Sequence, residues 1–245
     1  MEITSGLHRL GDGIVNVYLV EESAQVTIID AGVPSYWNEL PAALERMGRS
    51  LADVRAVLLT HGHSDHIGFA ERARREASLP VMVHESDAAL ARGEVPNPAK
   101  GLGPMRLLPM FRFLAWSLRH GALRMKNVAE VSTFGDGATL DVPGSPRVIH
   151  VPGHTPGCAA LHFVGQQALL AGDALCTLNV MNGARGPQIA PFTANRAQAL
   201  DSLARLVGLD ARFVLPGHGE PWSDGIDDAI RHVRDAAGHS GAPRG

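Results

Sequence analysis

Thr60-His61-Gly62-His63-Ser64-Asp65-His66 is the stretch around which the rest of this chain is arranged. It follows the apolar run 54–59 (VRAVLL), which has the length and β-branched content of a short buried strand, so the histidines lie on a loop at the strand's end. Alternate side chains of an extended loop share one side. This H-x-H-x-D-H spacing supplies more nitrogen and oxygen donors than a polar loop uses, and it therefore indicates a metal site.

Length and composition are typical of one globular domain. The 245 residues are 45% apolar and 19% charged, which predicts a single α/β domain with a sizeable core. The net charge of −3 and a pI near 6.4 show no basic excess. Neither nucleic acid nor an anionic membrane surface is therefore expected as a partner.

The ends and the cysteines suggest an intracellular protein. The N-terminus lacks a basic segment followed by an apolar core, and no run approaches the roughly 18 apolar residues of a membrane span. We therefore expect a cytoplasmic location. Cys158 and Cys176 are too few for a disulfide framework and lack CxxC spacing, which predicts small reduced core residues.

Strand and helix patterns alternate along the chain, which predicts a layered α/β domain. The first two strands are joined by four polar residues, which is a hairpin signal. The expected strands are 13–20, 25–29, 54–59, 80–83, 147–151, 158–164, 167–171 and 212–215, and the expected helices are 37–47, 69–77, 85–92, 194–207 and 226–237.

The segment from about 93 to 130 differs from its surroundings and reads as a helical insert. Proline and glycine break its start, and residues 96–131 carry a local charge of about +5. One interpretation is an amphipathic helix whose arginines are solvated. Another is a lid over the site, with large apolar side chains at an entrance and an arginine holding an anionic group. Burial in a homodimer and transient membrane contact are the remaining alternatives. The residues concerned are Phe111, Phe113, Leu114, Trp116, Arg106, Arg112, Arg119 and Arg124.

Further histidines and carboxylates follow other expected strands, each flanked by glycine or proline. Such loops hold a ligand rigidly. A catalytic zinc usually takes three protein groups and a water, so seven candidates fit two metals roughly 3.5–4 Å apart. His84 and His150 are candidates to support the ligands by hydrogen bonds. The seven candidate ligands are His61, His63, Asp65, His66, His154, Asp173 and His218.

The motifs HGHSDH, GHTPG, AGD and PGHG, preceded by Asp30 and spread over about 190 residues, closely resemble the metallo-β-lactamase superfamily. The resemblance implies a four-layer αββα sandwich with the metals at one edge of two central sheets. It also implies that Asp30 helps to orient the histidine loop. The resemblance further assigns His61, His63 and His154 to a first metal, Asp65, His66 and His218 to a second, and Asp173 to a bridge between them.

The same resemblance implies a hydrolase with two zinc ions, or iron or manganese in their place. Zinc lowers the pKa of bound water to about 7, so a metal-bound hydroxide can attack a carbonyl without a serine or cysteine nucleophile. Asp65 is the expected residue to orient that hydroxide and pass its proton onward. The expected substrate is a small acyl ester, thioester or lactone.

The loops that select the substrate depart from the known subgroups. The chain ends one short helix after His218, whereas glyoxalase-II-type thioesterases carry a further helical region. It has only Tyr18 and Tyr36, whereas acyl-homoserine lactonases have a tyrosine beyond the bridging aspartate. A β-lactam-hydrolysing enzyme and a di-iron redox or oxygen-handling protein remain the alternatives, although the former are exported and the latter resemble fusions with a flavin domain.

Overall fold

The strand that precedes the histidine loop shows how the layers form. In the computed structural model, which describes residues 1–99 and 105–239, this strand is β5 (Val54–Leu59). Val57 and Leu59 pack into a cluster that includes helical residues, whereas Ala56 and Leu58 pack into a cluster shared with a second sheet. Because successive strand residues point to opposite faces, a strand that is apolar on both faces must be covered on both sides.

β5 lies inside a seven-stranded sheet whose strands follow one another in sequence order. The strands from β1 to β4 pair antiparallel, and those from β4 to β7 pair parallel. The parallel strands therefore end at the same edge of the sheet. The other strands are β1 (Glu2–Thr4), β2 (Leu7–Gly11), β3 (Asn16–Glu22), β4 (Gln25–Ile29), β6 (Val81–His84) and β7 (Ser132–Phe134).

A second sheet of four strands packs against the first, in the order β13-β10-β9-β8. Its strands are β8 (Arg147–His150), β9 (Ala159–Phe163), β10 (Ala168–Gly172) and β13 (Phe213–Pro216). β10 and β13 are parallel, so their carboxyl ends also meet. A small hairpin of β11 (Cys176–Leu178) and β12 (Arg185–Gln188) follows β10.

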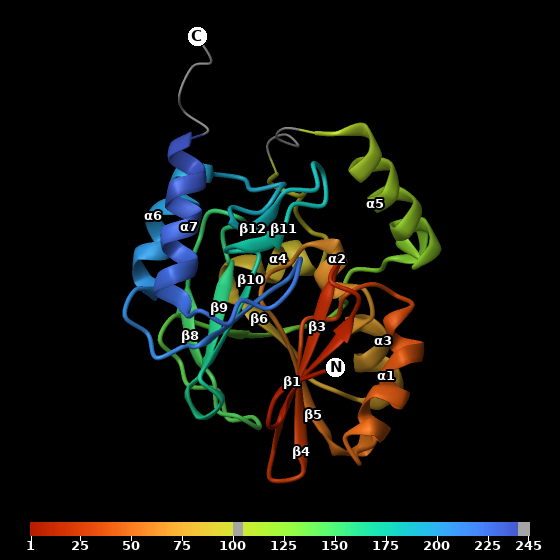
Figure 1. Cartoon of the computed structure of the whole chain (residues 1–245). Helices are drawn as coiled ribbons and strands as arrows, with labels where there is room; N and C mark the ends of the chain where they lie inside the picture. Colours follow the sequence, from red (N-terminus) through yellow and green to blue (C-terminus); the bar gives the residue numbers. More distant parts are fainter. Residues whose placement is uncertain (100–104, 240–245) are drawn as a thin grey trace.

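Helices cover the outer face of each sheet (Figure 1). α1 (Tyr36–Arg46) and α3 (Ala70–Ala77) share an apolar cluster with the first sheet, and α6 (Arg196–Ser202) and α7 (Ile226–His239) share one with the second. A third cluster fills the space between the sheets. The expected αββα sandwich is confirmed. The short helices α2 (Ser64–Ile67) and α4 (Ala88–Ala91) lie at the edge where the parallel strands end.

Most expected elements are present, with some boundaries shifted. The expected helix 194–207 is wrong as one helix, because the chain forms α6 and then tightens into a 3-10 turn at Leu203–Leu206. The expected helix 85–92 is a 3-10 turn at Glu85–Asp87 followed by α4. β1, β2, β7, β11 and β12 were not expected, and residues 133–134 of β7 were expected to belong to a turn. The mixed burial of these strands gives no clean alternation of apolar and polar residues.

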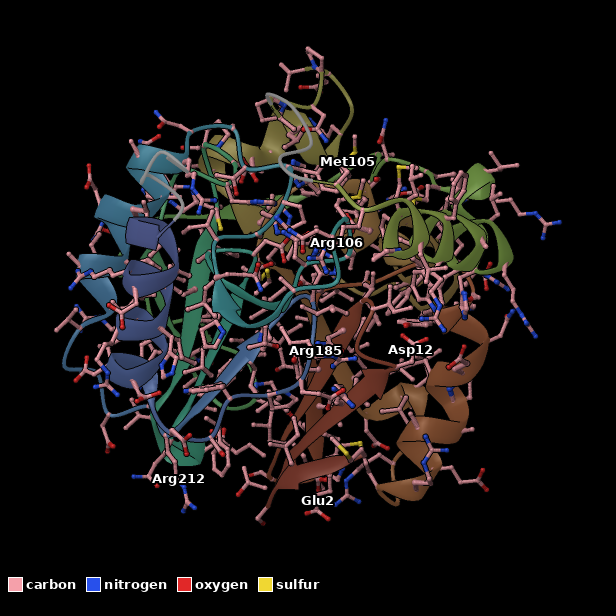
Figure 2. The ribbon with its side chains drawn as sticks, turned by 45° about the horizontal axis from the view of Figure 1, so that its top comes forward. Glu2, Asp12, Met105, Arg106, Arg185 and Arg212 are labelled. Atoms are coloured by element: carbon pink, nitrogen blue, oxygen red, sulfur yellow. The ribbon has the colours of Figure 1, made fainter. Side chains whose placement is uncertain are left out.

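The segment 93–130 contains α5 (Leu107–Arg119) and a 3-10 turn at Ala122–Arg124. Figure 2 shows Arg106 at the start of α5, where its backbone N–H donates to Met181 in the connection between β11 and β12. Trp116 holds the helix to the body, because its Nε1 donates to Asp12 at 2.7 Å and its ring packs edge-on against Tyr36 of α1. The segment thus joins two distant parts of the domain.

α5 also presents large apolar side chains to solvent. Leu107 is 72% exposed and Phe111 is 57% exposed. Among residues 1–99 and 105–239, no helix combines the length and the apolar character that crossing a bilayer requires. The roles expected for this segment, as a lid, an interface or a membrane contact, stay predictions.

Candidate metal centre

The ends of four strands bring the seven candidate ligands together. β5 leads into the histidine loop, β8 into the loop that carries His154, β10 into Asp173, and β13 into His218. Strands from both sheets therefore contribute, and the site lies at the edge where the two sheets meet (Figure 1). The side chains of residues far apart in sequence meet there because β5 runs parallel to β4 and β6, and β10 runs parallel to β13, so that these strands end at that edge.

His61, His63 and His154 form one group of three. One ring nitrogen of each lies within 4.8 Å of those of the other two, and all three residues are buried. His154 Nε2 lies 2.9 Å from His63 Nδ1. Three imidazoles around one point match the donor set of a catalytic zinc, which takes three protein groups and leaves a position open.

Asp65, His66 and His218 form a second group within the same 4.8 Å limit. His218 Nε2 lies 3.4 Å from Asp65 Oδ2. Both histidines are buried, whereas the Asp65 side chain is 25% exposed. The second group thus has two fixed imidazoles and one carboxylate that reaches solvent.

Asp173 lies between the two groups. Its Oδ2 is 3.4 Å from His154 Nε2 of the first group and 3.3 Å from His218 Nε2 of the second. Its Oδ1 is 3.7 Å from His66 Nε2 and accepts no hydrogen bond within the described part of the chain. A carboxylate in this position touches both groups and can bridge two cations.

The unsatisfied polar atoms of the cluster test whether it fits a metal. Within the described residues, His61 Nε2, His66 Nε2 and Asp173 Oδ1 are buried and have no hydrogen-bond partner. Buried polar atoms without a partner are unfavourable, and in a native protein they call for an ion or another explanation. Imidazole and carboxylate together suit zinc, iron and manganese. The residues therefore fit a pair of divalent metals.

The outer nitrogens of the imidazoles are held by neighbouring groups. Asp30 lies 2.9 Å from His66 Nδ1, and it also accepts from Thr60 N at 2.8 Å. Thr60 Oγ1 in turn lies 3.1 Å from His61 Nδ1. The structure thus places Asp30 against the histidine loop. Such partners fix the orientation of a ligand ring and its tautomer.

Two further imidazoles have partners from more distant segments. His154 Nδ1 lies 3.0 Å from Thr193 Oγ1, and His218 Nδ1 hydrogen-bonds to the carbonyl of Ile14. The sequence analysis missed Thr193 and Ile14. A threonine hydroxyl and a backbone carbonyl carry no local signature of this role.

Asp87 is a buried carboxylate that the sequence analysis also missed. It accepts hydrogen bonds from Gly62 N at 2.9 Å, Thr155 Oγ1 at 2.7 Å and Gly157 N at 2.7 Å. Gly62 belongs to the histidine loop, and the other two donors belong to the loop that carries His154. Asp87 therefore ties together the two loops that supply the first group of histidines.

Gly217 allows the backbone to pass close to the site. A Cβ built on it would lie 2.5 Å from Asp173 Oδ1 and would also collide with the ring of His66. Real Cβ atoms do not approach other heavy atoms so closely, and both neighbours are buried. Only glycine fits beside these two candidate ligands.

Burial and neighbouring carboxylates separate the pKa values of the histidines. Burial lowers the pKa of His154 to about 3, because the attraction of Asp173 offsets only part of the desolvation. Burial also opposes charge on His66, but Asp30 and Asp173 outweigh it and raise its pKa to about 10. Asp173 similarly raises the pKa of His218 to about 9 against the effect of burial. The second group therefore attracts positive charge, as a cation site must.

Two other histidines named from sequence lie outside the cluster. His84 and His150 stack on each other with their ring centres 4.1 Å apart. His150 Nε2 lies 2.8 Å from the carbonyl of Pro156, so it supports the loop that carries His154 without touching a candidate ligand ring. Cys158 and Cys176 are buried free thiols whose pKa values burial raises, which agrees with the core role expected for them.

The chain is similar in sequence and fold to known proteins. The Bacillus subtilis (strain 168) probable metallo-hydrolase YflN is 31% identical over 241 residues, covering 91% of this chain and 87% of YflN. The Bos taurus acyl-coenzyme A thioesterase MBLAC2 is 27% identical over 231 residues, covering 85% of this chain and 79% of that protein. TTHA1623, solved in a di-iron-bound form, superposes with a TM-score of 0.60 at 26% identity, covering 91% of this chain and 96% of its own.

The family model that matches describes the metallo-beta-lactamase superfamily, and the match spans residues 10–218. That range runs from β2 to His218 and includes all seven candidate ligands. The fold, the clustered histidines and aspartates, and the relatives agree with this match. The chain belongs to the metallo-beta-lactamase superfamily.

Proposed function

We propose that this protein is a dinuclear metal-dependent hydrolase that cleaves an ester, thioester or lactone bond of a small acyl substrate. The observation that carries the proposal is the position of Asp173 between the two groups, within 3.4 Å of His154 and 3.3 Å of His218. Two zinc ions are the proposed cofactors. The di-iron form of TTHA1623 makes iron the first alternative, and imidazole with carboxylate also suits manganese.

Asp65 has a role in the proposed reaction that differs from that of the other candidate ligands. When bound, a metal pair of this kind lowers the pKa of water to about 7 and polarises the bond to be cleaved. Asp65 is the proposed catalytic base, because its side chain is 25% exposed while the other six candidates are at most 5% exposed. Burial raises the pKa of Asp65, but the neighbouring His66 and His218 lower it more, so its carboxylate is ionised and can accept a proton at neutral pH.

The likeness to MBLAC2 favours a thioester among the three bond types, because that relative is an acyl-coenzyme A thioesterase. The apolar side chains of α5 supply the proposed contacts for an acyl chain. Phe111 is the most suitable aromatic residue of α5, since it is 57% exposed, whereas Trp116 packs against the apolar cluster of the first sheet. A homodimer that uses the same apolar face is the competing proposal for α5.

Metal analysis and a substrate panel test the proposal together. Protein purified without chelators is expected to carry two transition-metal ions per chain, and Asp173→Ala is expected to lower the occupancy of both sites. The wild type is expected to hydrolyse at least one class among acyl lactones, acyl thioesters and aryl esters. Two bound metals with no turnover on any of these classes would contradict the proposed chemistry.

Asp65→Asn separates catalysis from metal binding. This variant keeps the size and an oxygen donor of the side chain but removes the base, so we expect a metallated protein that loses most of its rate. Wild-type turnover by fully metallated Asp65→Asn would show that another group accepts the proton.

A further inference from the structure

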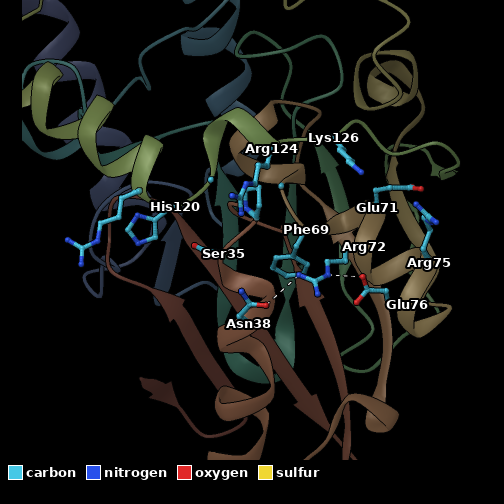
Figure 3. Close-up of a pocket in the computed structure, with 14 residues that line it drawn as sticks. Ser35, Asn38, Phe69, Glu71, Arg72, Arg75, Glu76, His120, Arg124 and Lys126 are labelled. Carbon is cyan, nitrogen blue, oxygen red and sulfur yellow. Dashed lines mark hydrogen bonds and ion pairs between the residues drawn. The ribbon is translucent and has the colours of Figure 1, made fainter.

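A cavity of about 520 Å³ lies between the amino-terminal half of the chain and the end of the insert (Figure 3). None of the seven candidate ligands lines it. One wall is formed by α1 and α3, and the other by the chain from Arg119 to Lys126. Its charged side chains are Arg72, Arg75, Arg119, Arg124, Lys126, Glu71 and Glu76.

The two acidic residues of the cavity are already engaged by other groups. Glu71 accepts two hydrogen bonds from the Arg74 guanidinium at 3.0 Å and one from the backbone N–H of Ala129. Glu76 accepts from Arg72 at 2.8 Å and from Trp37 Nε1 at 3.2 Å. Both carboxylates thus have their hydrogen bonds directed to Arg74, Arg72 and other donors, and neither is within ion-pair distance of Arg75, Arg119, Arg124 or Lys126.

Four cations remain without an ion pair within the described part of the chain. Arg75 stands on the α3 wall, and Arg119, Arg124 and Lys126 stand on the opposite wall. Figure 3 shows Arg124 and Lys126 on one side of the cavity and Arg75 on another. Cations gathered around one cavity repel one another, and an anion between the walls relieves that repulsion.

The start of α1 adds donors to the same cavity. Ser35 precedes the first residue of this helix of 11 residues, and Ser35 and Asn38 both line the cavity. The Ser35 hydroxyl oxygen is buried and has no hydrogen-bond partner among the described residues. The amino terminus of an α-helix carries a partial positive charge, which favours an anion. The backbone N–H groups of Ser35, Tyr36 and Asn38 already donate to carbonyls, so the Ser35 hydroxyl is the donor that this end of α1 offers to the cavity.

We propose that this cavity binds a small molecule that carries two or more phosphate groups. The volume lies within the range of about 300–1,000 Å³ typical of small-molecule sites. The arginine guanidinium groups on the two walls suit phosphate, because each guanidinium can donate two charge-assisted hydrogen bonds to two oxygens of one phosphate. A single carboxylate would engage only one wall, whereas a diphosphate reaches cations on both. The inference does not depend on which bond the metal centre cleaves.

Isothermal titration with pyrophosphate, ADP and adenosine tests the proposal on the metal-loaded protein. We expect pyrophosphate and ADP to bind at one site per chain, more weakly at higher salt, and adenosine not to bind. Arg75→Gln and Arg124→Gln remove one cation from each wall. Each is expected to weaken pyrophosphate binding about tenfold, which corresponds to about 1.4 kcal/mol, because each removes one charge-assisted contact to the phosphates. If ADP alone binds, the nucleoside contributes; if both bind alike, the phosphates suffice.

Arg212→Gln is the matched control. Arg212 lies at the opposite end of the molecule from α5 (Figure 2), and its substitution is expected to leave pyrophosphate binding unchanged. Absence of pyrophosphate and ADP binding would overturn the proposal. Binding that neither Arg75→Gln nor Arg124→Gln weakens would also overturn it, because the anion would then be held by the metals. An effect of only one of these two substitutions would contradict a site between the walls.

Discussion

Asp87→Ala is the substitution that most directly tests how the metal loops are held. Asp87 is completely buried and accepts from Gly62 N, Thr155 Oγ1 and Gly157 N at 2.7–2.9 Å. Alanine removes all three acceptor contacts and leaves two backbone N–H groups and a hydroxyl without a partner. The two loops that carry His61, His63 and His154 would then lose their shared anchor.

The expected loss of stability follows from these three hydrogen bonds. Each bond to a charged group contributes about 1.5–3 kcal/mol, but burying the carboxylate is itself unfavourable, so we expect a net loss of about 4 kcal/mol. That corresponds to a decrease in Tm of about 8–16 °C for a chain of this size. Asp87→Asn keeps the acceptor toward Gly62 and Thr155 but turns an amide N–H toward Gly157. We expect it to cost about 2 kcal/mol.

Urea unfolding and metal competition are the two assays. Wild type, Asp87→Ala and Asp87→Asn are unfolded in urea, and their zinc affinity is measured against a chromophoric chelator. Zinc affinity is expected to fall about tenfold for the variants, because a loosened loop orients its ligands less well. Asp224→Ala, at an exposed carboxylate, controls for loss of charge. An Asp87→Ala protein with wild-type urea midpoint and wild-type zinc affinity would refute the reasoning.

Three further perturbations follow from the structure. Gly217→Ala places a Cβ 2.5 Å from Asp173 Oδ1, so elemental analysis should show reduced metal content; full occupancy would contradict the close approach. Burial lowers the pKa of His84 from its usual value of 6.5, so the folded protein favours the neutral imidazole. As the pH drops below 6.5, the unfolded chain takes up the proton more readily, and the free energy of unfolding decreases. His84→Gln should therefore lose less stability than wild type between pH 7 and 5.5 in urea titrations. An equal loss would show that His84 does not cause the pH dependence. Trp116→Ala removes the hydrogen bond that holds α5 to Asp12, so if α5 is a lid, this change should raise KM more for long than for short acyl substrates. A changed oligomer size, seen by light scattering, would instead indicate an interface.

Local patterns in the sequence predicted most of the elements and named all seven candidate ligands. The run from Val54 to Leu59 is apolar on both faces, which identifies a buried strand whatever packs on it. The histidines and aspartates stand at strand ends beside glycine or proline, and this local pattern is readable without any contact. The division of the ligands into two groups came from the resemblance to a family, since spacing alone leaves it open.

Which residues outside the motifs support the sites is seen only in the tertiary structure. Asp87 reads as an ordinary acid in a short helical pattern, and only the approach of the histidine loop and the Gly157 loop buries it among three donors. Arg75 and Arg124 read as solvated charges on separate helices, and the docking of the insert places them around one cavity. The physical reason is that local periodicity reports which face of an element is apolar. Distances between elements depend on the order and register of strands, which bring together residues remote in sequence.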